Sequence, residues 1–459
     1  MVTETDYNMR PLVHEGFPAE EFSARRARVL DAIGASAHGL LQGAGPVRGF
    51  EVFRQNNEFH YLTGLDVPQC YLLLDGSRRT ASLYLPSRGS RPSSEGAALG
   101  SEDAIELRAL TGVDHVFGLD ALAAHVAEVS VVYTPHSPAE GRRSSRDELL
   151  RSAKAIAADP WDSDPPREEK FAGALRARVP HLDIRDLSPV LDGLRLIKSP
   201  REIGAMRKAG VLSALAVVEG MRSTQPGVME YQLGAIAEYV FQVEGAQGTG
   251  YRAIIAGGTN IWYSHYFRNN CPLLEGDLVL MDYAPDIDNY TSDIGRMWPV
   301  NGVYSPLQRE LYGFIVTYHK AVLKRIRPGV MPRQALREAA EEMRPVVEAT
   351  TFSKPIYEAA ARRCLDFEGH LSHPVGMAVH DVGNYFDRPF EPGITITVDP
   401  QMWIPEENLY IRVEDSVAVT DTGVEVLTCA APLELDDVEE LMRQEGMLQR
   451  YPPLAEVLR

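Results

Sequence analysis

The chain has 459 residues, 44% hydrophobic and 24% charged, a composition typical of a globular protein long enough to form two domains. Its formal net charge is −18 and no basic stripe is visible, which argues against a nucleic-acid partner. No uncharged apolar run reaches roughly eighteen residues, so the sequence predicts no membrane span.

The N-terminal segment and the cysteines indicate the compartment. Met1–Phe17 contains acids and proline and no apolar run, so it is not expected to be a secretory signal. The cysteines are Cys70, Cys271, Cys364 and Cys429. No two of them have CxxC spacing, which favours reduced thiols over a disulfide framework or a zinc site. We therefore expect a cytoplasmic protein.

Residues 1–187 are predicted to form a mixed α/β domain. Strand-like apolar runs occur at Cys70–Leu74 and Ala81–Leu85, with a turn signal at Asp75-Gly76 between them. Ser87–Ser101 is predicted to be an exposed loop, and the proline-rich Asp159–Glu169 an irregular surface segment.

A second domain, residues 188–459, is predicted from a strong helix start. Ser199-Pro200-Arg201-Glu202 has the pattern of a capping box with proline at the first helical position, and the helix should run to about Arg222. A second amphipathic helix is expected over Met229–Glu244, before Gly245.

The first candidate site is a pair of aspartates in a predicted hairpin. Strand-like runs at Leu278–Tyr283 and Tyr290–Pro299 flank the turn-forming cluster Pro285–Asn289, which should place Asp282 opposite Asp293, or nearly so. Two carboxylates ~5 Å apart across a ladder repel each other, and a bound cation would remove that repulsion. The alternative is a pair of exposed aspartates at a hairpin edge.

A second carboxylate pair follows near the C-terminus. Asp399 shares a strand face with Thr395 and Thr397, and Arg412 and Glu414 form a polar face farther along the chain. Asp282 lies six positions after Gly276, and Asp399 lies six positions after Gly393. This repeat predicts two related halves that each contribute two carboxylates.

Three histidines lie close together between these pairs, at His370, His373 and His380. Carboxylates combined with imidazole favour Mn²⁺, Fe²⁺, Co²⁺ or Zn²⁺ over Ca²⁺. His319 stands alone, and we expect it to be structural.

These motifs resemble the aminopeptidase P and prolidase family of "pita-bread" metallopeptidases, over about residues 187–432. The N-terminal third resembles the family's accessory domain, because Phe53–Asn57 and Tyr61–Gly64 match its FRQ…YLTG stretch. The resemblance implies an α/β fold: a creatinase-like mixed α/β domain (1–187) followed by a pita-bread catalytic domain (188–459) with pseudo-twofold halves.

The resemblance also implies the site residues. The family's metal ligands fall on Asp282, Asp293, His373, Asp399 and Glu414, which would hold two divalent ions, Mn²⁺ first, with Co²⁺, Zn²⁺ or Fe²⁺ as alternatives. Catalytic roles fall on His265, His380 and Glu414, with Glu414 accepting the proton of the nucleophile. Tyr251 would line the pocket and Arg412 would support the site.

The implied reaction is C–N hydrolysis of a peptide or small amide, usually an Xaa–Pro bond, by an aminopeptidase or a prolidase-type dipeptidase. The family also implies a homodimer or a higher homo-oligomer. Two other hypotheses remain open: a metal-dependent enzyme acting on a non-peptide small molecule, and a non-catalytic binding module.

Three departures from the family pattern bear on specificity. Asp399 replaces the glutamate of the VEPG segment, and Gln401-Met402-Trp403 replaces Gly-Leu-Tyr. Gly369 takes the first histidine position of the HGxSH segment, with His370 displaced by one.

Overall fold

The structure, a computed structural model, describes residues 16–47, 49, 51–90, 99–370 and 372–453. Most of the predicted N-terminal segment 1–17 and about half of the predicted loop 87–101 therefore lie outside the described residues. The chain divides into two compact units, Met1–Arg195 and Leu196–Arg459. The boundary expected near Ser188 falls at the first residue of helix α8 (Ser188–Leu196), in which the first unit ends.

The N-terminal unit is built on a six-stranded mixed sheet in the order β4-β3-β2-β1-β5-β6. The predicted strands flanking Asp75-Gly76 pair antiparallel as β2 and β3, whereas β4, β5 and β6 run parallel to their neighbours. The strands are β1 (His38–Gln42), β2 (Tyr71–Asp75), β3 (Thr80–Leu85), β4 (His115–Gly118), β5 (Val131–Thr134) and β6 (Asp183–Asp186).

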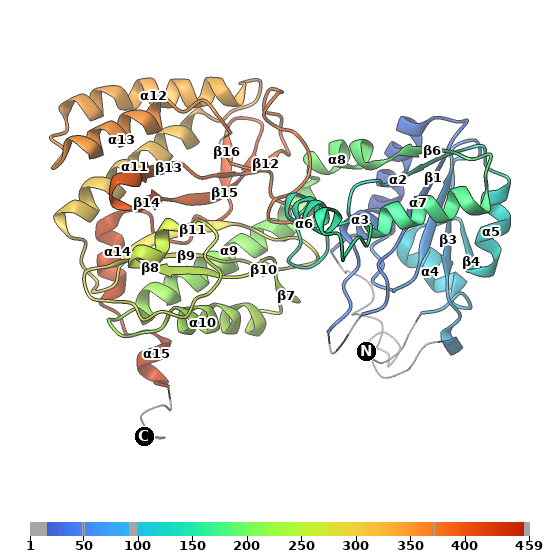
Figure 1. The fold of residues 1–459 in the computed structure, drawn as a ribbon, viewed down its shortest axis with the longest axis horizontal. Coiled ribbons are helices and arrows are strands. Elements are labelled where there is room, and N and C mark those ends of the chain that lie inside the picture. The colour runs from blue at the N-terminus through green and yellow to red at the C-terminus, as the bar shows by residue number, and fades with distance from the viewer. Residues whose placement is uncertain (1–15, 48, 50, 91–98, 371, 454–459) are drawn as a thin grey trace. The chain divides into compact units, whose positions relative to one another are not determined.

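Helices flank this sheet (Figure 1), and α5 and α7 share one apolar core with Leu40, Leu73 and Tyr84 of its strands. Among the described residues, the helices that precede α8 are α2 (Ala19–Ile33), α3 (Asn57–Thr63), α4 (Ala104–Thr111), α5 (Asp120–Ala127), α6 (Arg146–Ala158) and α7 (Arg167–Arg178). A short 3-10 turn, η2 (Arg88–Ser90), follows β3.

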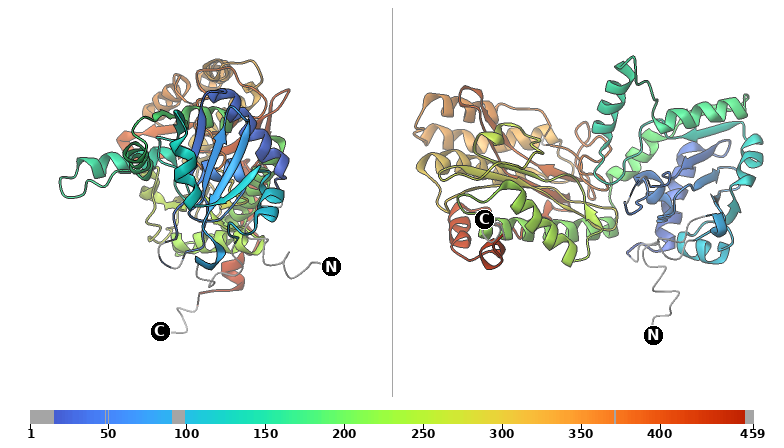
Figure 2. Two further views of the ribbon diagram at one scale, coloured as in Figure 1. Left: turned by 90° about the vertical axis from the view of Figure 1, so that its right-hand side faces the viewer. Right: turned by 60° about the horizontal axis from the view of Figure 1, so that its bottom comes forward.

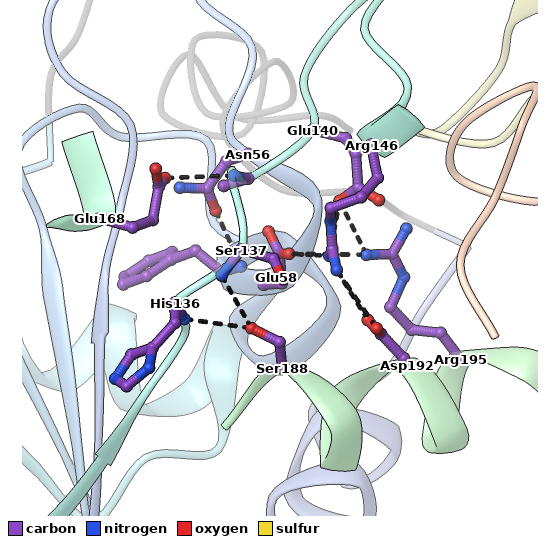
Figure 3. A network of polar contacts seen from close by, with 12 residues as sticks. Asn56, Glu58, His136, Ser137, Glu140, Arg146, Glu168, Ser188, Asp192 and Arg195 are labelled. Atoms are coloured by element: carbon purple, nitrogen blue, oxygen red, sulfur yellow. Dashed lines mark hydrogen bonds and ion pairs between the residues drawn. The ribbon is translucent and has the colours of Figure 1, made fainter. Parts of the chain in front are cut away.

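A buried charge network lies inside the N-terminal unit (Figure 3). Glu58 of α3 accepts from Arg146 at 2.6 Å, and Glu140 lies 3.0 Å from Arg195. Arg146 also lies 3.2 Å from Asp192. Three carboxylates therefore share two guanidinium groups, so the network carries one excess negative charge when all of its groups are ionised.

The C-terminal unit is built on a second sheet in the order β12-β15-β11-β9-β8, with β16 paired to β15. A two-stranded ribbon of β13 and β14 and a short β7–β10 pair adjoin it. The strands are β7 (Gly248–Thr249), β8 (Ile254–Gly257), β9 (Leu278–Asp282), β10 (Pro285–Asp286), β11 (Ile294–Pro299), β12 (Thr395–Val398), β13 (Gln401–Ile404), β14 (Leu409–Arg412), β15 (Glu414–Val419) and β16 (Val424–Val426).

The predicted repeat is visible in this sheet. β9 pairs with β11, β12 pairs with β15, and the two pairs meet where β11 and β15 run antiparallel. The glycines that precede β9 and β12, Gly276 and Gly393, both have positive φ, 87° and 94°, a conformation that side chains other than glycine rarely adopt. Both β9 and β12 therefore begin beyond a similar turn, and an aspartate stands at the end of each: Asp282 is the last residue of β9, and Asp399 directly follows β12.

Helices cover both faces of this sheet, with α9 and α10 on one face and α11, α12 and α13 on the other (Figures 1 and 2). The capping box predicted at Ser199 is present and begins α9, which spans Pro200–Ser223. The remaining helices are α10 (Glu230–Val243), η3 (Gly258–Trp262), α11 (Pro306–Arg325), α12 (Pro332–Ala349), α13 (Pro355–Leu365), η4 (Pro405–Glu407), α14 (Leu435–Met442) and α15 (Met447–Arg450). Among the described residues, no helix combines the length and the apolar character needed to cross a membrane.

Candidate metal centre

Two of the predicted ligands lie in one row across three strands. Asp282, the last residue of β9, pairs with Gly295 of β11, and Gly295 pairs with Glu414, the first residue of β15. The expected partner of Asp282, Asp293, is therefore wrong by two residues, because Asp282 pairs with Gly295. Asp293 lies just before β11 and is a diagonal neighbour of Asp282. A shift of two residues keeps a side chain on the same face of a strand, so both aspartates can still face one site.

Gly295 separates the two acids of this row without filling the space between them. A Cβ atom at Gly295 would lie 3.0 Å from Cβ and 3.3 Å from Oε2 of Glu414. A larger residue would thus crowd the Glu414 carboxylate.

The other two carboxylates are held by the neighbouring strands. The Asp293 N–H donates to the Ser416 hydroxyl at 2.8 Å, which ties the start of β11 to β15. Asp399 follows β12, and its Oδ2 accepts from Gln401 Nε2 at 2.5 Å. Its Oδ1 is buried and has no hydrogen-bond partner among the residues that the structure describes.

The histidines are brought together by a loop rather than by a helix or strand. The N–H of Thr397 donates to the His373 carbonyl at 3.0 Å, which holds His373 beside β12. The N–H of Asp381 donates to the Pro374 carbonyl at 2.9 Å and closes the loop between His373 and His380. Asp381 also forms a buried ion pair with Lys198 at 3.1 Å.

This closure produces a row of three imidazoles. The ring centroids of His373 and His380 are 4.2 Å apart, and those of His380 and His265 are 5.7 Å apart. His373 Nε2 lies 3.5 Å from Asp293 Oδ2, so the row begins at the carboxylates. The structure therefore brings together His265, His373 and His380, the three histidines to which the resemblance gives a role. The remaining histidine of the predicted trio, His370, stacks on Phe386 instead.

Three of the five predicted ligands form a group suited to one ion. Asp293, His373 and Glu414 each offer a ligand atom, and these atoms lie within 4.8 Å of one another. The separation allows a single ion to contact all three after small side-chain movements.

Asp282 and Asp399 are instead engaged by Arg412. Its guanidinium binds Asp282, lies 3.3 Å from Asp399 and lies 3.0 Å from Glu414. All four of these residues are at most 6% exposed. A buried cation thus already compensates part of the charge at the place where a second metal ion is expected.

Tyr251 links the two aspartates of the first half. Its hydroxyl lies 2.6 Å from Asp282 Oδ1 and 2.9 Å from Asp293 Oδ1, within hydrogen-bonding distance of both. Burial raises the pKa of Tyr251 well above its usual value, and the charges of Asp282 and Asp293 raise it further. Tyr251 therefore stays protonated and serves as a donor between the two acids.

The electrostatics of the centre favour a bound cation. Burial raises the pKa of Asp293 well above its usual value, and Glu414 and Asp282 add to the effect. The pKa of Glu414 is raised in the same way, by burial and by Asp399. Four buried carboxylates surround one guanidinium, so holding them all ionised requires added positive charge.

A separate network behind Glu414 stabilises β15. Asp415 accepts from Arg296 at 2.6 Å and lies 2.8 Å from His319 Nε2. Burial acts to raise the pKa of Asp415, but Arg296, His319 and Thr428 outweigh it and hold that pKa below its usual value. His319 is fully buried in this network, which fits the structural role expected for it.

The carboxylates and imidazole fit divalent metal ions. Three ligand atoms converge, Asp399 Oδ1 is buried without a partner, and Gly295 keeps the space beside Glu414 open. Oxygen and imidazole ligands are those of Mn²⁺, Fe²⁺, Co²⁺ and Zn²⁺ sites.

Two cavities adjoin the centre within the C-terminal unit. One, of about 330 Å³, lies against α11, α12 and α13 and is lined by Asp399, Gln401 and Trp403 among others. The other, of about 720 Å³, is a groove lined by His265 and by residues on either side of it in the chain.

The sequence prediction missed Gly295 and Ser416, and it named Gln401 as a departure from the family pattern without its hydrogen bond to Asp399. Gly295 could have been found as the glycine two residues after Asp293, because a strand glycine often marks a close approach. Neither Gln401 nor Ser416 carries a comparable signal in the sequence.

Comparisons with known proteins match both parts of the chain. The model of metallopeptidase family M24 matches residues 204–421, and that of the aminopeptidase P N-terminal domain matches residues 22–133. The Xaa-Pro aminopeptidase of Haemophilus influenzae is 30% identical over 452 residues, which cover 93% of this chain and 97% of that protein. The Xaa-Pro aminopeptidase of Escherichia coli is also 30% identical, over 92% of this chain and 97% of that protein.

Solved structures show the same similarity. Proline aminopeptidase P II from Yersinia pestis matches with a TM-score of 0.74 and 29% identity, over 93% of this chain and 100% of that chain. Zinc-substituted E. coli aminopeptidase P in complex with product matches with a TM-score of 0.72 and 27% identity, over 93% of this chain and 98% of that chain. These matches confirm the predicted fold class, a mixed α/β domain followed by a pita-bread catalytic domain. The chain belongs to metallopeptidase family M24, on its aminopeptidase P branch.

Proposed function

We propose that the protein is an Xaa-Pro aminopeptidase that uses two divalent metal ions to remove an N-terminal residue preceding proline. The observation that carries the proposal is the convergence of Asp293, His373 and Glu414, continued by the imidazoles of His380 and His265. It occurs in a chain that is 30% identical to named Xaa-Pro aminopeptidases over nearly its full length.

The ligands divide between the two proposed ions. Asp293, His373 and Glu414 would hold one ion, and Asp282 and Asp399 would complete the second site once Arg412 withdraws. When bound, such ions polarise the scissile carbonyl and lower the pKa of a water toward neutrality. Manganese is our first expectation for the metal, with cobalt, zinc and iron as alternatives.

The side chains around the ligands would do the remaining work. The Glu414 carboxylate would accept a proton from the attacking water and pass it toward the leaving nitrogen. His380 and His265 would donate hydrogen bonds to the substrate, because a neutral imidazole donates without carrying a permanent charge. Tyr251 would hold Asp282 and Asp293 in place through its hydroxyl. We further propose that the enzyme is cytoplasmic and assembles as a homodimer or a higher homo-oligomer.

The test begins with protein stripped of metal and reloaded separately with manganese, cobalt, zinc or iron. Each form is assayed on Ala-Pro-Ala, Ala-Ala-Ala and the dipeptide Ala-Pro, and the bound metal is counted by elemental analysis. The proposal requires about two ions per chain and release of alanine from Ala-Pro-Ala but not from Ala-Ala-Ala. Asp293→Ala should lose at least one ion and the activity, whereas Asp421→Ala, at an exposed position, should change neither.

Other outcomes would identify the competing functions. Cleavage of Ala-Pro alone would make the protein a dipeptidase of the prolidase type. Two bound ions without cleavage of any peptide would favour a non-peptide substrate, and a folded protein that binds no metal would favour a binding module.

A further inference from the structure

The groove beside His265 has a composition unlike that of the chain as a whole. The chain has 64 acidic and 46 basic residues, yet the described residues lining this groove include two arginines and no acid. Both arginines, Arg252 and Arg268, are exposed, and neither forms an ion pair with another described residue. A pair of uncompensated guanidinium groups on an acidic protein is suited to bind an anion.

One acid lies behind the groove, but its charge is already satisfied. Glu230 is fully buried and accepts from Asn260, Tyr266 and the backbone N–H groups of Gly257 and Cys271. It therefore holds the groove wall in place and is shielded from the open space in front of it.

Arg252 is fixed in direction by the chain around it. Its Nε donates to the Phe267 carbonyl at 3.1 Å, and the Phe267 ring stacks against His265 with centroids 5.9 Å apart. The basic groups, the aromatic ring and His265 thus belong to one segment, residues 252–268, in which Phe267 contacts both Arg252 and His265.

The histidine row connects the groove to the metal ligands. His265 lines the groove, and two ring-to-ring steps of 5.7 and 4.2 Å lead from it to His373. The ends of the row are therefore at most about 10 Å apart, the length of roughly three residues of extended chain. A peptide cleaved at the ligands could reach the groove with the residues next to the bond.

The sizes of the two cavities indicate which part of the peptide enters each. An aminopeptidase has one residue before the cleaved bond and any number after it. The cavity of about 330 Å³ beside Asp399 is large enough for one side chain, whereas the groove of about 720 Å³ can take several residues. The groove is thus the better fit for the downstream part.

We infer that this groove binds the peptide downstream of the cleaved bond, and that Arg252 and Arg268 recognise a carboxylate there. The inference rests on the proposed function. The carboxylate has two possible sources, the C-terminus of a short peptide and an acidic side chain in a longer one. Both present the same planar group to a guanidinium.

The experiment separates these sources with two substrate pairs. Ala-Pro-Ala is compared with its C-terminal amide, and amidated Ala-Pro-Glu-Ala with amidated Ala-Pro-Lys-Ala. The wild type should prefer the member carrying the carboxylate in at least one pair, by about fivefold in kcat/KM for an exposed charge pair. Calorimetric binding of the product Pro-Ala and of its amide should show the same preference without turnover.

Variants assign the preference to the groove. Arg268→Ala should reduce the preference for the carboxylate. Arg268→Glu should reverse it, so that the lysine-containing peptide is cleaved better than the glutamate-containing one. Arg252→Gln should also weaken it, and Arg337→Glu, which reverses an exposed charge on α12, should leave it unchanged.

Equal efficiency on both members of both pairs, or a preference that survives Arg268→Glu, would overturn the inference. If metal-loaded enzyme cleaved no peptide, the proposed function would fail, and the calorimetric comparison would still decide whether the groove selects a carboxylate.

Discussion

The Arg412 guanidinium lies 3.0 Å from the Glu414 carboxylate and also contacts Asp282 and Asp399, so one side chain compensates three buried acids. Burial alone would lower the pKa of Arg412, but Tyr410, Glu414 and Asp282 outweigh it and raise that pKa further above its usual value. Arg412 therefore stays charged, and it competes with a metal ion for the same oxygen atoms.

Arg412→Ala should destabilise the metal-free protein much more than the metal-loaded protein. Removing one partner of a buried charge pair typically costs about 3–5 kcal/mol, and bound metal should replace most of the lost compensation. The measurement is the melting temperature of wild type and variant, each with and without manganese. Arg412→Lys, which keeps the charge, is the matched control and should lose less. An equal loss with and without metal would show that Arg412 does not share its role with an ion.

His380→Ala should lower kcat about 10²–10⁴-fold while leaving the metal content unchanged. The reason is its position, in ring contact with His373 but outside the group of converging ligand atoms. Steady-state kinetics and elemental analysis on the same preparation provide the measurement. Loss of metal from this variant would mean that His380 is itself a ligand or fixes one.

Asp399→Glu should retain metal but lose about 10²-fold in kcat/KM on the best substrate found. Asp399 accepts from Gln401 and borders the cavity that Gln401 and Trp403 line, so a longer carboxylate should displace this wall by about 1 Å. Efficiency equal to or above that of the wild type would show that the shorter acid is a neutral replacement. Ordinary Xaa-Pro specificity would then need no revision on this ground.

Glu58→Gln should increase stability relative to the wild type as the pH rises. Burial and the charge of Glu140 raise the pKa of Glu58 from its usual value of 4.5 to about 8, although Arg195 and Arg146 oppose the shift. Because the folded-state pKa is the higher one, the contribution of Glu58 to stability is complete below about pH 4.5 and is lost as the pH rises toward 8.

Denaturant unfolding at several pH values between 4 and 9 measures this effect. The free-energy difference between variant and wild type should change over that window by a few kcal/mol in favour of the variant. Glu148→Gln, which removes a half-exposed carboxylate paired with Arg151, is the control and should show little pH dependence. A constant loss of stability in Glu58→Gln would indicate that Glu58 is ionised throughout and acts only as a partner of Arg146.

The first two helices of the C-terminal unit, α9 and α10, could be predicted from local chemistry. Ser199, Pro200 and Glu202 each have a fixed role at a helix start, so α9 begins where they indicate. The register of the hairpin was harder to predict, because Pro285–Asn289 contains several turn-forming residues and the turn could be centred on any of them. The turn is at Asp288-Asn289, where both residues have positive φ, 51° and 64°. Two adjacent residues that tolerate this conformation are the signal for such a turn, and centring the hairpin there pairs Asp282 with Gly295.

The loop and the arginine contacts could not be predicted in the same way. His373 and His380 lie in an irregular loop, which has no periodicity, and their approach depends on the Asp381–Pro374 hydrogen bond and the Lys198–Asp381 ion pair. Lys198 is distant in the sequence, so its contact with Asp381 follows from tertiary packing. The clustering of His370, His373 and His380 in the sequence predicted an imidazole ligand beside the carboxylates, and the resemblance to a known family gave His373 and His380 their separate roles.

Cleavage of an unbiased peptide library by the manganese-loaded protein, with the cut bonds identified by mass spectrometry, tests the proposed activity most directly. We predict loss of a single N-terminal residue from peptides with proline second, and no such loss with Asp293→Ala under the same conditions. Cleavage at internal bonds, cleavage indifferent to proline, or intact peptides after incubation with fully metal-loaded enzyme would contradict Xaa-Pro aminopeptidase activity.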